Sequence, residues 1–184
     1  MIVERMAIPE VMRIIPPRFA DSRGHFSETY TASKFAAIGI PDLFIQDNQS
    51  RSKKNVVRGL HLQIAPAVMG KLVRVVQGRI WDVAVDVRHG SPTFGQHVAT
   101  YLSAEEGDQF WVPGGFLHGF VALEEGTEVL YKVTAPYMRE AERGVRWDDP
   151  ALAIPWPVNP AAAIVSDKDR VMPLLSECEP WFHV

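Results

Sequence analysis

The sequence predicts an all-β protein, either a sandwich or a small barrel, and two features carry that prediction. Five segments between residues 71 and 134 are rich in valine, phenylalanine, tyrosine and leucine, residues that favour strands. Turn-forming breaks separate the segments, as at Gln77-Gly78 and Glu124-Glu125-Gly126. Many short strands at this spacing are typical of sandwiches and barrels. The expected strands are Lys71–Val76, Ile80–Val87, His97–Leu102, Phe116–Leu123 and Glu128–Thr134.

Side-chain alternation is clearest in the strand expected at residues 80–87. A tryptophan and three valines, at positions 81, 83, 85 and 87, share one face, whereas Asp82 and Asp86 point the other way. Helix is scarce by comparison. We expect one short helix over Ser33–Ile38, stopped by Gly39, and another turn that begins after Ser166 as its N-cap.

Composition limits the class of protein. The chain has 184 residues, of which 47% are hydrophobic and 22% are charged, so we expect residues 1–184 to form one domain. The net charge of −3 provides no basic field for nucleic acid or an anionic membrane, and apolar runs are shorter than the roughly 20 residues that span a bilayer. No signal peptide is visible and Cys178 is the single cysteine, so we expect a cytoplasmic protein without an internal disulfide.

Two histidine motifs give the first specific signal. The spacing Gly107-x5-Pro113-x-Gly115-x2-His118 resembles the second cupin motif, and Gly59-Leu60-His61-Leu62-Gln63 resembles an incomplete first one. A metal-binding cupin would carry His-x-His followed shortly by Glu, but residues 65–70 contain no carboxylate. Two histidines are too few to hold a divalent ion well. We therefore expect no metal and no cofactor, which leaves His61 free to act as a base.

A longer series of motifs covers nearly the whole chain, from about Arg13 to about Leu175. In this order the motifs resemble the dTDP-4-dehydrorhamnose 3,5-epimerase family. The resemblance implies a cupin-type double-stranded β-helix, a jelly-roll barrel with a few short peripheral helices and a C-terminal tail packed on it. The motifs are Asp21–Tyr30, Gln46–Ser52, Val57–His61, Gly70–Val75, Asp82–Arg88, Ser91–Gly95, Pro113–Phe120, Tyr131-Lys132, Glu142–Pro150 and Ser166–Asp169.

The resemblance also implies catalytic roles for four residues. Epimerisation beside a ketone needs a base, and histidine suits that role because its ordinary pKa lies near neutrality. By family match, His61 takes the proton and Asp169 orients the imidazole. Lys71 would stabilise the developing oxyanion, and Tyr131 would return a proton on the opposite face.

Strand parity supports part of this assignment independently of the family. Tyr131 shares a face with valines 129 and 133, and Lys71 shares one with valines 73 and 75. A lysine on an otherwise apolar strand face is costly to bury unless it has a partner or a function. Arg58 and His61 would face opposite sides of a regular strand, so placing both in one site requires a bulge, for which Gly59 is a natural position.

The implied substrate is a dTDP-4-keto-6-deoxy sugar, whose anionic pyrophosphate calls for arginine and lysine. Tyr137 would stack on the thymine. The family builds its site at a dimer interface with strands exchanged between subunits, so we expect a homodimer. The binding residues implied by the resemblance are Arg23, Glu28, Gln46, Asp47, Asn48, Arg58, His118, Tyr137, Glu142 and Lys168.

Structural roles are the alternative for several of these residues. Taken alone, His61 is a satisfied strand histidine, and Tyr131 is a core tyrosine with its hydroxyl tied to a neighbour. Asp169 also suits the first turn of a helix, Lys71 a surface ion pair, and His118 a remnant of a metal site. Three other functions compete: a single-carbon epimerase of a related dTDP-4-keto sugar, a metal-dependent cupin oxygenase or isomerase, and a catalytically silent sugar-nucleotide binding module.

Overall fold

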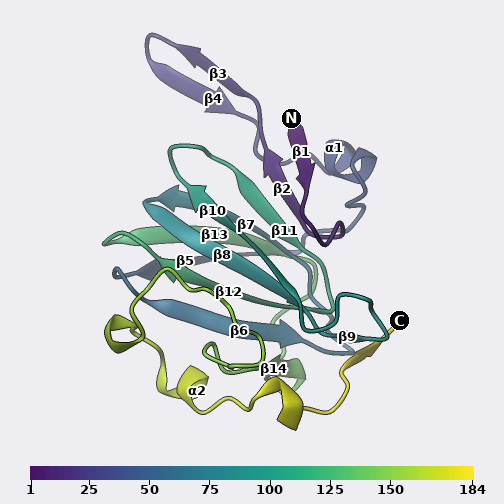
Figure 1. Ribbon diagram of the computed structural model, residues 1–184. Coiled ribbons are helices and arrows are strands. Elements are labelled where there is room, and N and C mark those ends of the chain that lie inside the picture. Colours follow the sequence, from purple (N-terminus) through teal and green to yellow (C-terminus); the bar gives the residue numbers. More distant parts are fainter.

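A computed structural model describes residues 1–184, and its framework is two antiparallel sheets that face each other (Figure 1). The six-stranded sheet runs in the order β1 (Ile2–Arg5), β2 (Met12–Ile15), β11 (Gln109–Val112), β7 (Lys71–Gln77), β13 (Thr127–Val133) and β5 (Gln46–Ser52). The five-stranded sheet runs in the order β10 (His97–Ser103), β8 (Arg79–Asp86), β12 (Phe116–Ala122), β6 (Val57–Gln63) and β14 (Glu142–Gly144).

The predicted all-β class is confirmed, and each of the five predicted strands is present to within one residue at either end. The predicted helix is α1 (Ala32–Ala37), and the predicted turn after Ser166 is α2 (Asp167–Arg170), whose first turn is capped by the Ser166 hydroxyl. The smaller elements are the hairpin β3 (Arg18–Asp21) and β4 (Gly24–Ser27), the parallel pair β9 (Arg88–His89) and β15 (Phe182–His183), and the 3-10 turns η1 (Arg139–Ala141), η2 (Pro160–Ala162) and η3 (Leu175–Glu177).

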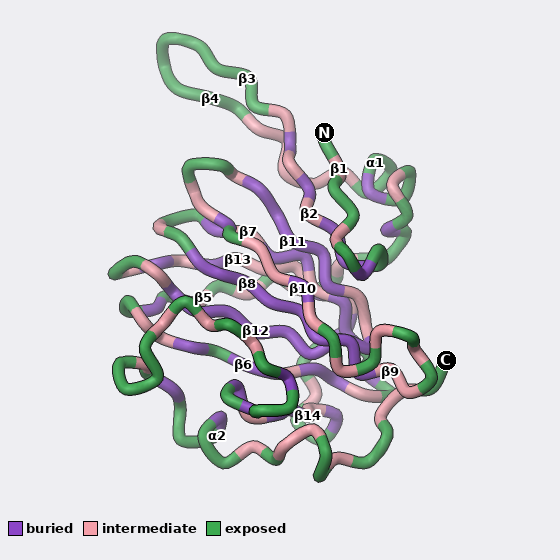
Figure 2. The backbone as a smooth tube through the Cα atoms, viewed as in Figure 1, coloured by how far each residue is buried: buried purple, intermediate pink, exposed green.

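The main core fills the space between the two sheets. Val73 and Val129 from the six-stranded sheet pack with Ile80, Phe116 and Phe120 from the five-stranded sheet, and each is at most 4% exposed. Figure 2 shows β8 and β12 buried along most of their length. Burial of apolar surface in a close-packed interior is the dominant favourable contribution to folding.

A second core covers the outer face of the five-stranded sheet. Trp81 and the valines that alternate with it pack against the segment after β14, including Trp147 and Leu152. The Trp156 ring packs edge to face on both of the other tryptophans, with its centroid 5.3 Å from that of Trp81 and 6.0 Å from that of Trp147. The predicted alternation is therefore confirmed, because these residues face outward while Asp82 and Asp86 are fully buried on the inner side.

A bulge in β6 occurs at the predicted glycine. His118 pairs with His61 and Phe120 pairs with Arg58, so three steps along β6 match two steps along β12. Gly59 has φ +122°, and a Cβ built there would lie 2.6 Å from the Gly119 Cα. The two glycines allow the strands to approach closely, and the extra residue directs both Arg58 and His61 toward the same side.

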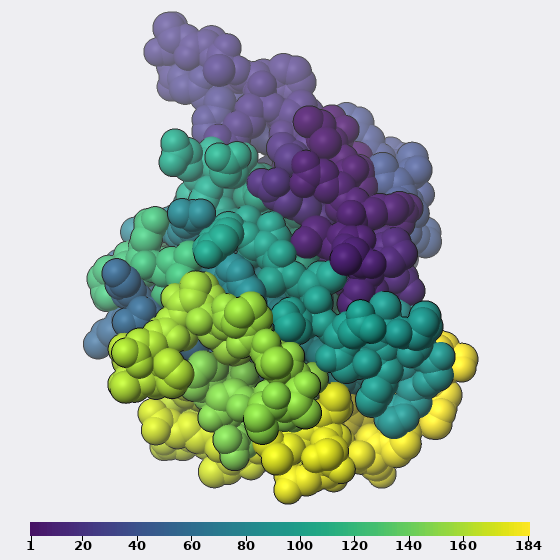
Figure 3. All heavy atoms as spheres, viewed as in Figure 1, coloured from purple at the N-terminus to yellow at the C-terminus, as the bar shows by residue number.

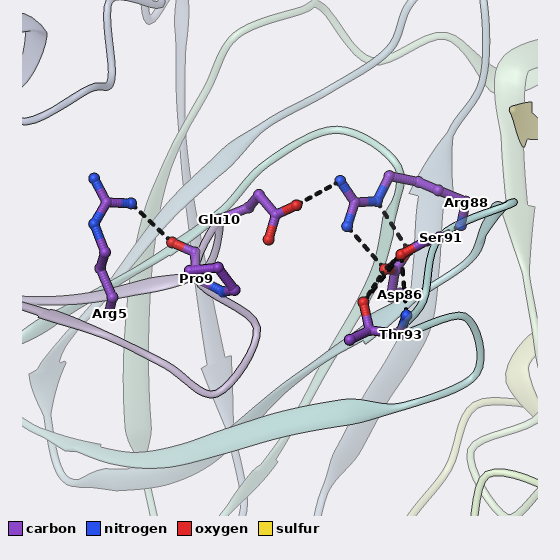
Figure 4. Close-up of polar contacts among 7 residues, drawn as sticks. All are labelled: Arg5, Pro9, Glu10, Asp86, Arg88, Ser91 and Thr93. Atoms are coloured by element: carbon purple, nitrogen blue, oxygen red, sulfur yellow. Dashed lines mark hydrogen bonds and ion pairs between the residues drawn. The ribbon is translucent and has the colours of Figure 1, made fainter. Parts of the chain in front are cut away.

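A polar network around the buried Asp86 holds the loop that follows β8 (Figure 4). The Asp86 carboxylate accepts hydrogen bonds from Arg88 at 2.9 Å and from the hydroxyls of Ser91 and Thr93 at 2.6 Å each. Burial alone would raise the pKa of Asp86, but these donors lower it to about 2. Arg88 also reaches Glu10 at 2.9 Å, so the network ties this loop to the N-terminal segment.

The hairpin β3–β4 projects away from the rest of the molecule (Figures 1 and 3). Its two phenylalanines, Phe19 and Phe26, stack at 6.4 Å and remain 61% and 67% exposed. Apolar side chains on a projecting arm are typical of a contact surface. None of the helices has the length and apolar character needed to cross a bilayer.

Candidate active site

A cavity of about 480 Å³ opens inside the barrel, large enough for a small-molecule ligand. The structure brings together in its wall the four residues predicted to be catalytic, together with three of the predicted binding residues. The lining residues are Ser50, Val56, Val57, Arg58, His61, Lys71, His118, Phe120, Tyr131, Ile164, Val165, Ser166, Lys168 and Asp169.

His61 on β6 is hydrogen-bonded to Asp169 on α2, with 2.7 Å between Nε2 and Oδ1. Asp169 occupies the first turn of α2, where its backbone N–H donates to the Ser166 hydroxyl at 3.1 Å. Its second oxygen accepts from the Gly59 N–H at 3.4 Å. The sequence offers two alternatives for Asp169, a place in the first turn of a helix or a contact with His61. The structure shows both.

Asp169 remains an anion in this setting. Burial raises its pKa, but the hydrogen bond and charge of His61 and the hydrogen bonds with Gly59 and Ser166 outweigh burial, so the pKa lies below its ordinary value. A carboxylate on Nε2 fixes the orientation of the ring and leaves Nδ1 as the nitrogen that Asp169 does not engage. This arrangement stabilises an imidazolium once His61 has accepted a proton.

Lys71 enters the barrel from β7 and lies beside the histidine. Its ammonium donates to the His61 carbonyl oxygen at 3.2 Å, and it forms no ion pair, so the alternative of a surface ion pair is wrong. Burial lowers the pKa of Lys71 to about 8, against the opposing influence of the charges on Asp82 and Glu142. The side chain retains accessible surface where it faces the cavity.

A second histidine–aspartate pair lies next to the first, with its histidine on the neighbouring strand. His118 on β12 is the direct partner of His61, and its Nε2 is 2.6 Å from Asp82 Oδ1. The carboxylate of Asp82 is fully buried, and its Oδ2 has no hydrogen-bond partner. No group of three or more histidine, cysteine or acidic side chains is close enough to hold a metal ion.

Tyr131 on β13 faces the same cavity from the six-stranded sheet. It packs on Val129 and Val133, as strand parity predicts, and its hydroxyl forms no hydrogen bond with the protein. Burial raises the pKa of Tyr131, and the positive charge of Arg58 only partly opposes that effect. The phenol is therefore protonated at neutral pH and is available as a donor.

Tyr137, Glu142 and Lys168 form a hydrogen-bonded cluster, of which Lys168 lines the cavity. The Tyr137 hydroxyl donates to Glu142 at 3.0 Å, and the Lys168 ammonium donates to the same carboxylate oxygen. Burial raises the pKa of Glu142, but the donors outweigh it and the pKa is lowered overall. The Tyr137 ring is 57% exposed, so one of its faces is free for a flat ligand.

Comparison with known proteins identifies the family of this chain. Residues 5–177 match the dTDP-4-dehydrorhamnose 3,5-epimerase family. The chain belongs to that family. A dTDP-4-dehydrorhamnose 3,5-epimerase from Pseudomonas aeruginosa is 52% identical over 90% of this chain and 91% of its own length. Another from Sinorhizobium fredii is 47% identical over 96% and 91% of the two chains.

The solved structures agree on the fold. A dTDP-6-deoxy-D-glucose-3,5-epimerase from Legionella pneumophila, in complex with dTDP-4-keto-L-rhamnose, superposes with a TM-score of 0.92 at 44% identity. The match covers 96% of this chain and 94% of that one. The predicted cupin-type fold of this epimerase family is thereby confirmed.

Strand β5 of this family member places its predicted binding residues on two faces. Gln46 and Asn48 point inward and are hydrogen-bonded to each other at 2.7 Å. Asp47 points outward, where its carboxylate pairs with Lys132 at 3.0 Å and lines a separate cavity of about 130 Å³. Arg58 is held at the cavity by the Ser52 hydroxyl, at 3.1 Å.

Seven of the ten predicted binding residues do not line the cavity, and two of the seven lie in or next to the β3–β4 hairpin. Arg23 is at the tip of the β3–β4 hairpin, where its guanidinium donates to Asp21 at 2.7 Å. Glu28 follows the hairpin and pairs with Lys34 at 2.6 Å. Neither residue lines the cavity.

Sequence reasoning missed two polar residues of the site. Alternation predicts that Asp82 lies on the inner strand face, but its histidine partner is 36 residues away in the sequence and is brought to it only by the pairing of β12 with β8. Ser50 belongs to the matched motif Gln46–Ser52, from which no role for it follows, yet it lines the cavity. Its signal was its parity with Asn48 and Ser52 along β5.

Proposed function

We propose that this chain is a 3,5-epimerase that converts dTDP-4-dehydro-6-deoxy-D-glucose into dTDP-4-dehydro-L-rhamnose. The observation that carries the proposal is the His61–Asp169 pair, 2.7 Å apart, in one cavity with Lys71 and an untied Tyr131 hydroxyl. Close relatives over nearly the whole chain support the choice of substrate.

The first step is removal of a proton from the carbon beside the C4 ketone. His61 accepts the proton, and the electron pair of the C–H bond moves onto the ketone oxygen to give an enolate. Asp169 stabilises the imidazolium that forms. The Lys71 ammonium, adjacent to His61, is suited to stabilise the negative oxygen because a charge is worth more in a poorly hydrated cavity.

The second step returns a proton to the same carbon from the opposite face. Tyr131 comes from the six-stranded sheet, whereas His61 comes from the five-stranded sheet, so the two groups approach from different walls of the cavity. The phenol gives its proton to the carbon, the enolate collapses to the ketone, and the configuration is inverted. Exchange with solvent then restores both residues, and the sequence is repeated at the second carbon.

Substrate binding uses charge at the mouth of the cavity. Arg58 and Lys168 line the wall and suit the pyrophosphate. The exposed ring of Tyr137 suits the thymine, while Glu142 fixes Tyr137 and Lys168 in place. His118 contacts the sugar from the cavity wall, and the inner side chains of β5, Gln46 and Asn48, hold the nucleotide with the backbone at Asp47.

The proposal includes a homodimer in which each site receives the hairpin of the other chain. Arg23 and Glu28 do not reach the cavity of their own chain, and the hairpin carries exposed Phe19 and Phe26 on a projecting arm. Insertion into a second copy would bury those rings and bring a further cation to an anionic ligand. We propose that residues 1–184 act as one domain within this dimer.

A coupled assay tests the function. Purified protein is mixed with the 4-keto sugar nucleotide and a downstream reductase in the presence of a chelator. Turnover is expected without added metal. In deuterated water, both C3 and C5 should acquire deuterium. Exchange at one carbon alone would favour the single-carbon epimerase, whereas loss of activity with chelator and its return with a divalent ion would favour the metal-dependent alternative.

A further inference from the structure

The inner row of β5 contains one hydroxyl that the protein leaves without a partner. Four polar side chains point inward along this strand. Gln46 and Asn48 bond to each other, and Ser52 accepts from Arg58. Ser50, between these two pairs, has a buried Oγ with no hydrogen bond, and it is the member of the row that lines the cavity.

An unpartnered hydroxyl at this position has an energetic consequence. Buried polar groups in proteins almost always have a partner, because removing a hydroxyl from water without replacing its hydrogen bond is unfavourable. The neighbouring side chains of β5 are already engaged, so Ser50 has no obvious protein partner within its row. Ser50 itself lines the cavity, so rotation about its Cα–Cβ bond turns the hydroxyl toward a ligand that can supply the missing bond.

The register of the sheet places Ser50 close to the proposed acid. Asn48 pairs with Tyr131, and Ser50 pairs with Val129, so Ser50 is the next inward residue beside the tyrosine. Residues in such diagonal positions are near neighbours on one sheet face. Ser50 and Tyr131 thus share one wall of the cavity, and His61 belongs to the other.

We infer that Ser50 hydrogen-bonds a hydroxyl group of the bound sugar and holds the ring against Tyr131 for the return of the proton. The inference rests on the proposed function and adds a substrate-positioning residue to it. A serine hydroxyl both donates and accepts, which matches a sugar hydroxyl. It carries no charge for a pyrophosphate, and Arg58 and Lys168 already provide charge in this cavity.

The experiment compares two ligands in two variants. Ser50→Ala removes the hydroxyl, and Ser176→Ala is the matched control because Ser176 is exposed in η3, away from the lining of the cavity. Binding is measured by titration calorimetry with dTDP and with dTDP-L-rhamnose, which lacks the reactive ketone. Ser50→Ala should bind dTDP-L-rhamnose about tenfold more weakly and dTDP normally, as expected for loss of one hydrogen bond to the sugar.

Turnover and isotope exchange provide the second readout. The kcat/KM of Ser50→Ala should fall about tenfold or more, with inverted product reduced more than deuterium exchange, while Ser176→Ala behaves as wild type. Equal weakening of both ligands, or no weakening of either, overturns the inference. If the wild type turns over the keto sugar and Ser50→Ala matches it, only the role of Ser50 fails. A wild type without turnover overturns the proposed function and this inference together.

Discussion

His61 and His118 lie directly opposite each other on β6 and β12, and each is hydrogen-bonded through Nε2 to its own buried aspartate. The two pairs are not equivalent. Each carboxylate oxygen of Asp169 has a partner, His61 or the Gly59 N–H, whereas Asp82 has one oxygen without a partner and its charge raises the pKa of the nearby Lys71. One pair is therefore suited to accept a proton, and the other contributes negative charge beside the ammonium.

Replacing the base tests the first pair. His61→Asn should lower kcat by at least about a hundredfold, the usual contribution of a general base, while dTDP binding changes little. The coupled assay and calorimetry measure the two quantities. His183→Ala is the control, since His183 is exposed on β15 and is no part of the cavity. Full activity in His61→Asn would show that His61 is not the catalytic base.

Removing the phenol separates the two half-reactions. Tyr131→Phe keeps the ring that packs on Val129 and Val133, so the fold should be preserved. His61 can still remove a proton and exchange it with solvent, but no group remains to deliver one from the other wall. Deuterium exchange should persist while inverted product falls by about a hundredfold, as followed by NMR. Parallel loss of both would mean that Tyr131 acts before proton removal.

The charge of Lys71 predicts an upper pH limit. Because burial lowers its pKa to about 8, the ammonium is intact below that pH and is lost as the pH rises through it. The kcat/KM should therefore decline above about pH 8. Asp82→Asn removes a charge that supports the ammonium, so the decline should move to lower pH. If the decline of kcat/KM at high pH is the same in Asp82→Asn as in the wild type, another group than Lys71 causes that decline.

The bulge makes a prediction about stability. A Cβ at Gly59 would lie 2.6 Å from the Gly119 Cα, and the residue has φ +122°. Gly59→Ala should thus lower the free energy of unfolding by more than the roughly 1 kcal/mol expected from positive φ alone, and activity should fall with it. Gly95→Ala is a matched control, with φ +76° and open space around the site. Urea unfolding compares them, and equal losses would mean that the close approach has no cost.

The strands between residues 71 and 134 could be predicted because each has one or both faces in a core, which selects the apolar residues that favour strands. The hairpin β3–β4 could not, because its residues are mostly exposed and no core selects among them. The bulge at Gly59 was predictable from a conflict in parity between Arg58 and His61. The position of Asp47 could not be predicted from its motif. The motif assigns one role to Gln46, Asp47 and Asn48 together, but neighbours in a strand face opposite ways, and Asp47 points outward to Lys132.

Mixed dimers test the exchanged hairpin. Arg23→Ala should weaken catalysis because the partner's site loses a cation, and His61→Asn should inactivate the site of its own chain. In a dimer of one chain of each kind, the site with intact His61 receives the hairpin with intact Arg23. Random pairing of equal amounts makes half of the dimers mixed with one intact site each, so about a quarter of wild-type activity should return, above the activity of either variant alone. Recovery requires that the hairpin serves the other chain. Activity equal to the average of the two separate variants would show that Arg23 acts within its own chain or not at all, and the exchanged arrangement would have to be abandoned.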